Sequence, residues 1–216
     1  MKIISTNLAK PRTIFHEGRA EQTGIFKEPV DQSLFLGHLD VAGDTVADRV
    51  HHAGVDKACY LYGYNHYPFW QDQYPHLAFA FGMFGENLTI DHLDESVIRI
   101  GDIFNVGSAV IQVTQPRQPC HKLGIKFNAP QIINQFQNAP YPGVYVRVLQ
   151  PGTVTSGDEL VPVNTDDQAP NVLDIYRMLF AKSISQINEF PAHYLTYPTL
   201  AERVKEKFRQ RFGALI

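Results

Sequence analysis

The sequence predicts a mainly β protein with some α-helix. We expect residues 1–163 to form a barrel or sandwich domain with helical insertions, and residues 164–216 to form a small bundle of three helices. Many short apolar runs separated by turn residues occupy the first part, which is typical of barrels and sandwiches. A polar run that ends in proline, residues 164–170, then reads as a linker, and after it the apolar residues recur at helical spacing.

The strands of the first part are predicted from apolar runs bounded by turn signals. Gly-Asp, Gly-Ser and Pro-Gly pairs supply those signals. The predicted strands are, in chain order, 2–7, 34–37, 58–62, 98–106, 109–114 and 144–149. Two helical insertions are expected between them, over 65–73 and 130–138.

The last 50 or so residues carry three helix signals. Asn171 is placed to cap a first helix. Residues 183–186 and 199–202 both fit the capping-box pattern. In the last helix the apolar residues fall on one stripe, and we interpret the basic residues as a solvated face. The apolar stripe consists of Leu200, Val204, Phe208 and Phe212.

Composition excludes several classes of protein. With 44% hydrophobic and 19% charged residues the chain has the profile of a globular domain, and its formal charge of −3 provides no basic field for nucleic acid. The N-terminal residues turn polar too soon for a signal peptide, and no apolar run approaches the roughly 20 residues of a membrane span. We therefore expect a cytoplasmic protein with reduced thiols and neither membrane nor nucleic-acid partners.

The segment Gln115-Pro116-Arg117-Gln118-Pro119-Cys120 is the most informative part of the chain. Proline fixes φ and has no N–H, so we expect a rigid loop that neither continues a paired strand nor enters a helix. Cys120 lies beside Arg117, His121 and Lys122. A thiol among cations favours the thiolate, which is a nucleophile or a ligand for a soft metal. Cys59, inside an apolar run, is interpreted as a small buried hydrophobe.

Two further polar clusters interrupt the β pattern, at residues 51–57 and 82–88. The first combines imidazole, carboxylate and ammonium groups, and the second has glycines that permit close backbone approach to a ligand. A solvated loop and an ordinary turn remain alternatives for them. A zinc site from His51, His52 and Cys120 also stays open, although adjacent histidines on a strand point to opposite faces. The chain has no dinucleotide-binding, P-loop, zinc-protease or nucleophile-elbow motif.

In this order the three clusters resemble the MOSC family, named after the C-terminal domain of molybdenum-cofactor sulfurases. Residues 100–102, 145–149 and 157–158 also match, and the C-terminal helices resemble the extension of the bacterial YiiM-like subgroup. Ala53, Val55 and Cys59 stand where glycine, proline and valine are common, which alters the rigidity of the histidine loop.

The resemblance implies a β-barrel that binds molybdenum cofactor (molybdopterin) and, in this subgroup, reduces N-hydroxylated bases such as 6-N-hydroxylaminopurine. Cys120 would ligate molybdenum, and His52 or Asp56 would deliver protons. Electrons would come from an external reductase, because the chain shows no flavin or nicotinamide fingerprint, and a homodimer is expected by analogy. The expected cofactor-binding residues are His51, Lys57, Glu86, Asn87, Gln115, Arg117 and Lys122.

Two alternative functions stay open at this point. Other family members use the cysteine for persulfide or sulfur transfer, so the chain would then be a carrier. A non-catalytic barrel that binds a small anion or a protein partner is the other alternative. Metal analysis and activity toward an N-hydroxylated base distinguish the three.

Overall fold

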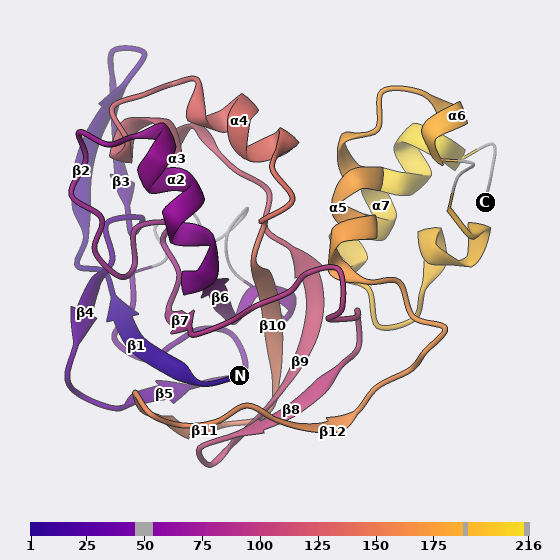
Figure 1. Cartoon of the computed structure of the whole chain (residues 1–216), viewed down its shortest axis with the longest axis horizontal. Helices are drawn as coiled ribbons and strands as arrows, with labels where there is room; N and C mark the ends of the chain where they lie inside the picture. Colours follow the sequence, from indigo (N-terminus) through magenta and orange to yellow (C-terminus); the bar gives the residue numbers. More distant parts are fainter. Residues whose placement is uncertain (46–53, 188–189, 214–216) are drawn as a thin grey trace.

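The computed structural model describes residues 1–45, 54–187 and 190–213. Its centre is an eight-stranded sheet with the strand order β12-β8-β9-β10-β6-β7-β1-β4 (Figure 1). These strands are β1 (Ile3–Leu8), β4 (Glu28–Val30), β6 (Cys59–Gly63), β7 (Leu88–Ile90), β8 (Ile103–Val106), β9 (Ala109–Pro116), β10 (Val144–Gln150) and β12 (Val161–Asn164). Two small two-stranded sheets complete the β structure, from β2 (Arg12–His16) with β3 (Arg19–Thr23) and from β5 (Leu34–Leu36) with β11 (Gly152–Val154).

The expected barrel is not closed. Within the described residues β4 and β12 are the two edges of the large sheet, and each has a single neighbour in it. All neighbours pair antiparallel except β6 and β7, which run parallel. The fold is therefore a mixed α/β structure built on one large open sheet.

Helices cover the sheet in two groups (Figure 1). The first group contains η2 (Tyr64–His66), α2 (Tyr67–Gln73), α3 (His121–Lys126) and α4 (Ile132–Asn138). It matches the insertions expected near 65–73 and 130–138. An aromatic cluster joins this group to β6, because Tyr62, Trp70, Phe84 and Phe136 are all buried there. The Trp70 Nε1–H donates a 2.7 Å hydrogen bond to the Tyr62 hydroxyl, so the polar atoms of these rings are also satisfied.

The C-terminal region differs from a bundle of three helices. It contains α5 (Val172–Phe180), α6 (Ile184–Ile187), η3 (Ala192–Thr196) and α7 (Glu202–Phe212). In the described part of the chain α6 and η3 are single short turns, so the expected bundle is not confirmed. Asn171 caps α5 as predicted, since its side chain accepts from the Asp174 N–H at 2.7 Å. The cap expected from Thr199 is wrong, because α7 begins at Glu202 without a side-chain cap.

The apolar stripe of α7 is buried as predicted, and it packs into the same cluster as the sheet. That cluster contains Val204 and Phe208 of α7, Ile175 of α5, and Ile111 and Val113 of β9. The boundary near residue 163 stays a prediction. No helix among residues 1–45, 54–187 and 190–213 has the length and apolar character needed to cross a bilayer.

The cysteine segment also corrects two expectations. Pro116 is the last residue of β9 and pairs with Val144 of β10, so the paired strand extends two residues further than the predicted end at Thr114. Cys120 is then the N-cap of α3, a helix that the sequence pattern did not indicate. The segment between them is consequently a short connection, residues 117–119, held at both ends by regular structure.

Candidate functional site

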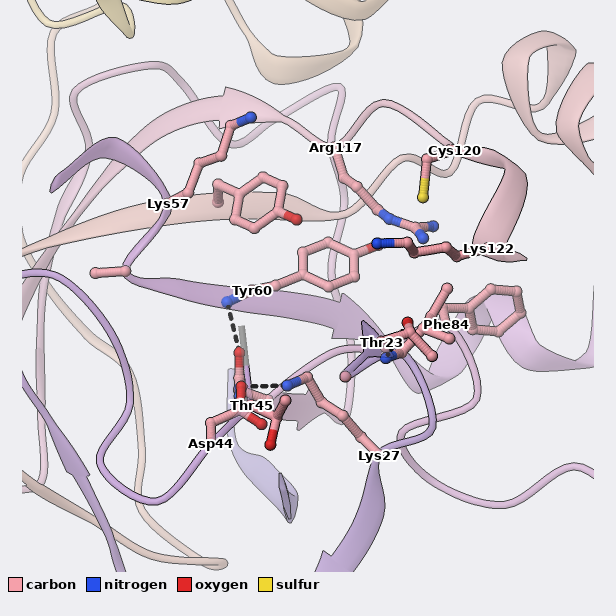
Figure 2. A pocket seen from close by; sticks show the side chains of 16 residues that line it. Thr23, Lys27, Asp44, Thr45, Lys57, Tyr60, Phe84, Arg117, Cys120 and Lys122 are labelled. Atoms are coloured by element: carbon pink, nitrogen blue, oxygen red, sulfur yellow. Dashed lines mark hydrogen bonds and ion pairs between the residues drawn. The ribbon is translucent and has the colours of Figure 1, made fainter. Parts of the chain in front are cut away.

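An inner cavity lies between β6, the β2–β3 hairpin and the cysteine segment (Figure 2), and together with the open solvent at its mouth it measures about 670 Å³. Three of the sequence clusters contribute to it, since Lys57, Asn87, Arg117, Cys120 and Lys122 all line it. The remaining lining residues are Thr23, Gly24, Ile25, Lys27, Asp44, Thr45, Ala58, Tyr60, Phe84, Gly85 and Tyr145.

Cys120 is positioned at this cavity by the end of β9 and the start of α3. Its side chain is part-exposed and forms no disulfide, and Figure 2 shows the sulfur directed toward the guanidinium of Arg117. Cys59 is the opposite case. It is 1% exposed and does not line the cavity, and burial raises the pKa of its thiol, so it packs as the sequence suggested.

Arg117 is the most unusual residue of the site. It is 5% exposed, and its guanidinium lies over two rings, 5.4 Å from the centroid of Tyr60 and 5.1 Å from that of Phe136. Its buried Nη1 has no hydrogen-bond partner. A buried N–H without a partner is costly, so a cation held in this state at a cavity wall indicates a site for an anionic ligand.

Three further cations line the inner cavity, namely Lys27, Lys57 and Lys122. Lys27 forms an ion pair with Asp44 at the base of the cavity (Figure 2), and both side chains are buried. Lys57 lies over the ring of Tyr145, 5.7 Å from its centroid. Among the described lining residues, four cations and the carboxylate of Asp44 make the wall electropositive, which suits a ligand with a phosphate group.

In the glycine cluster 82–88, the neighbouring residues Glu86 and Asn87 have different surroundings. Asn87 lines the cavity and is fixed there, because its Oδ1 accepts from the Tyr60 N–H at 3.3 Å and its Nδ2 donates to Asp44 Oδ2 at 2.8 Å. Glu86 is fully buried and does not line the cavity. It accepts from the backbone N–H groups of Gly82 (2.9 Å) and Phe84 (3.0 Å), so the structure places it under the loop as a support.

Of the predicted proton donors, the structure describes Asp56. Its carboxylate lies 2.6 Å from the guanidinium of Arg147, and it is not among the residues that line the inner cavity. His51 and His52 lie outside the described residues. Gln115 is buried and donates to the backbone oxygen of Asp56 at 3.3 Å.

An outer cavity of about 380 Å³, also open to solvent, adjoins the first one at Cys120. Lys57, Cys120, Lys122 and Tyr145 line both cavities, so the sulfur lies where they meet. Gln115 lines only the outer one. Within the described residues no cluster of three or more His, Cys, Asp and Glu side chains is arranged to hold a metal. The thiol of Cys120 is therefore the soft donor of this site.

Sequence reasoning missed Lys27, Asp44, Tyr60 and Tyr145. Lys27 and Asp44 stand outside all three clusters, and only their burial as a pair distinguishes them. The sequence did place both tyrosines on predicted strands, 58–62 and 144–149. Only the structure shows that both line the cavity beside residues of the clusters. Pairing of Tyr60 with Tyr145 across β6 and β10 then brings their rings to 5.0 Å between centroids.

Comparisons with known proteins agree with this geometry. The family model described as MOSC domain matches residues 48–161. The uncharacterized protein YflK of Bacillus subtilis is 35% identical over 216 residues, which cover 99% of this chain and 96% of that protein. A protein of Gibberella moniliformis named Reductase is 30% identical over 76% of this chain, a stretch that spans only 29% of its own length. The crystal structure of YiiM from Geobacillus stearothermophilus has a TM-score of 0.78 at 32% identity, covering 97% of this chain and 98% of that one.

Proposed function

The chain belongs to the MOSC domain family, and from that premise we propose that it is a molybdenum-cofactor-dependent reductase of N-hydroxylated bases. The observation that carries the proposal is the pairing of a part-exposed thiol at Cys120 with the buried, unpartnered Nη1 of Arg117 in one cavity. A relative named Reductase supports the redox assignment.

The residues present fit a pterin dithiolene with a phosphate tail. Cys120 would ligate the metal, because a thiolate suits a centre that already carries sulfur ligands. Arg117, Lys57 and Lys122 would hold the phosphate and the polar edge of the pterin, with Asn87 offering an amide. Bound in this way, the cofactor would supply two-electron reduction chemistry beside Cys120.

The overall reaction converts an N–OH group into N–H and releases water, so it consumes two electrons and two protons. The electrons come from a separate reductase protein. On this chain, His121 and Glu21 are placed to hold a proton at the outer cavity, because His121 Nε2 lies 2.6 Å from Glu21 Oε1 and both residues line it. The donor roles predicted for Asp56 and His52 remain predictions.

Metal analysis of freshly purified protein from a host that makes the cofactor tests the proposal. We expect molybdenum and a releasable fluorescent pterin in the wild type, and loss of at least nine-tenths of the molybdenum in Cys120→Ser. Cys59→Ala is the matched control, because it removes the other thiol without touching the cavity, and it should keep its molybdenum.

Activity toward 6-N-hydroxylaminopurine with an added reductase separates the alternatives. Molybdenum content together with turnover supports the reductase. Molybdenum without turnover points to a carrier, and a persulfide on Cys120 points to sulfur transfer. Full metal content and full activity in Cys120→Ser would overturn the assignment.

A further inference from the structure

The outer cavity has a cationic wall that the proposed function does not use. This wall is formed by α7, which contributes Arg203 and Lys207. Their spacing of four residues places them one helical turn apart on the same side of α7. The cysteine segment lines the same cavity, and the Lys207 ammonium contacts it through the side chain of Gln118.

The outer cavity is rich in positive charge, although the chain as a whole carries a net negative charge. Lys57, Lys122, Arg203 and Lys207 line the outer cavity, whereas the chain has a formal charge of −3. Among the described residues that line the outer cavity, Glu21 is the carboxylate; it pairs with His121, and the Lys122 Nζ lies 3.6 Å from it. Four cations in one cavity wall make it electropositive.

The environment of Lys207 shows the effect of this charge. Its ammonium is half-buried and donates to the side-chain oxygen of Gln118 in the cysteine segment. Burial, with added repulsion from Arg203 and Arg211, lowers its pKa. An anionic group in the cavity would relieve that repulsion, and the cavity, about 380 Å³ without the open solvent at its mouth, lies in the size range of small-molecule sites.

Two of the four cations of the outer cavity are additional to those of the inner cavity. Arg203 and Lys207 do not line the inner cavity, where Arg117 and Lys27 provide positive charge instead. Each cavity therefore has two cations of its own, and the two cavities share Lys57 and Lys122. Arg203 and Lys207 are the pair that the proposed cofactor site does not use.

We infer that the outer cavity is a substrate subsite for a phosphorylated N-hydroxylated nucleoside, with Arg203 and Lys207 binding its phosphate and its base lying toward Cys120. This inference rests on the proposed function for the identity of the base. Tyr145 lines the outer cavity together with Cys120, and aromatic side chains of this kind commonly contact nucleobases. A free base lacks the phosphate and makes none of the α7 contacts.

The test measures protection of Cys120 from alkylation by iodoacetamide in the full-length chain prepared without cofactor. Cys59 is buried and serves as the unreactive internal reference. We expect AMP to protect Cys120 at concentrations at least tenfold below those at which adenosine or inorganic phosphate does. In the double variant Arg203→Gln/Lys207→Gln this advantage of AMP should disappear, because two charge-assisted contacts are lost.

Arg209→Gln is the matched control, because it removes one positive charge from α7 at a residue that lines neither cavity. It should leave AMP protection unchanged, and Lys207→Arg should retain it. In cofactor-loaded protein, the ratio of kcat/KM for an N-hydroxylated nucleotide to that for its nucleoside should fall at least tenfold in the double variant.

Three results would overturn the subsite. Equal protection by AMP and adenosine in the wild type would show that the phosphate is not bound. Equal protection by AMP in the wild type and the double variant would place the phosphate elsewhere. A loss of molybdenum and pterin in the double variant would show that these cations hold the cofactor. Because alkylation needs neither metal nor turnover, it can succeed even if the reductase activity is absent.

Discussion

The carboxylate of Asp56 lies 2.6 Å from the guanidinium of Arg147, and this ion pair connects the C-terminal helices to the wall of the site. Asp56 directly precedes Lys57, which lines both cavities. Arg147 also donates to the Thr199 carbonyl at 3.2 Å, and the Glu202 N–H at the start of α7 donates to Asp56 Oδ2 at 3.3 Å. The helix that carries the outer cations is thus held to the segment that carries Lys57.

Replacing Asp56 with Asn should destabilise this connection. The pair is partly exposed, with 27% and 22% of the two side chains accessible, so we expect a loss of about 1–2 kcal/mol in the free energy of unfolding. Chemical denaturation measures it. A double-mutant cycle with Arg147→Met should give a coupling energy of about 1 kcal/mol. Strictly additive effects of the two substitutions would contradict the connection.

Arg117→Met separates a ligand-binding role from a structural one. In the cofactor-free protein the substitution removes a desolvated N–H without a partner, a cost of about 1–3 kcal/mol, while methionine keeps contact with Tyr60 and Phe136. Stability should therefore be unchanged or higher. Added pyrophosphate should raise the Tm of the wild type and not that of the variant.

Arg12→Met is the control for that experiment. Arg12 also lies over an aromatic ring, 4.3 Å from the centroid of Phe26, but it lines neither cavity. It should leave the effect of pyrophosphate intact. A loss of several kcal/mol in cofactor-free Arg117→Met would identify Arg117 as a structural cation instead.

Lys126 gives the protein a pH-dependent stability above neutrality. Burial lowers the pKa of its ammonium to about 8, and the group donates to the backbone oxygens of Ile25 (3.0 Å) and Gly82 (2.7 Å). Between pH 8 and 10 the unfolded chain holds this proton and the folded chain does not, so stability rises with pH in that window. Below pH 8 both states hold the proton and the slope vanishes.

Comparison with Lys126→Met isolates this effect, because the buried tyrosines titrate equally in both proteins. From pH 8 to 10 the free energy of unfolding of the wild type should rise relative to the variant by up to about 1.4 kcal/mol per pH unit. Urea denaturation at each pH measures the difference. Parallel pH curves for the two proteins would show that Lys126 is not desolvated in the folded state.

The sequence clusters singled out several residues that the fold brings together, although their functional roles stay predictions. Cys120, Arg117 and Asn87 do converge on one cavity. Sheet closure was not predictable, since alternation of apolar residues identifies strands and leaves open which edges pair.

The place of Pro116 was wrongly predicted for a related reason. β8 pairs with β9 only as far as Gln112, so near its end β9 has β10 as its neighbour and tolerates a residue without an N–H.

The roles of charged residues were harder to predict, because a carboxylate that binds a ligand and one that supports a loop have the same sequence signature. Asp56 was predicted as a proton donor, and its carboxylate pairs with Arg147. The basic residues of the last helix were interpreted as a solvated face, yet Arg203 and Lys207 line the outer cavity. In each case the deciding partner is distant in sequence, and only the folded chain brings it close.

Glu86→Gln tests whether the second cluster is held by a carboxylate beneath it. The four groups that donate to Glu86 are the N–H groups of Gly82 and Phe84 and the hydroxyls of Tyr67 and Thr89. In glutamine, one of the two oxygens is replaced by an NH₂ group, which donates hydrogen bonds and does not accept them. In either orientation of the amide, this NH₂ group would lie against a backbone N–H, that of Gly82 or that of Phe84. Because the site is fully buried, we expect a loss of about 1–3 kcal/mol in the free energy of unfolding. Stabilisation by pyrophosphate should persist in the folded variant, since Glu86 does not line the cavity. If stability is unchanged and pyrophosphate no longer stabilises the variant, Glu86 contacts the ligand after all, as its place in the sequence first suggested.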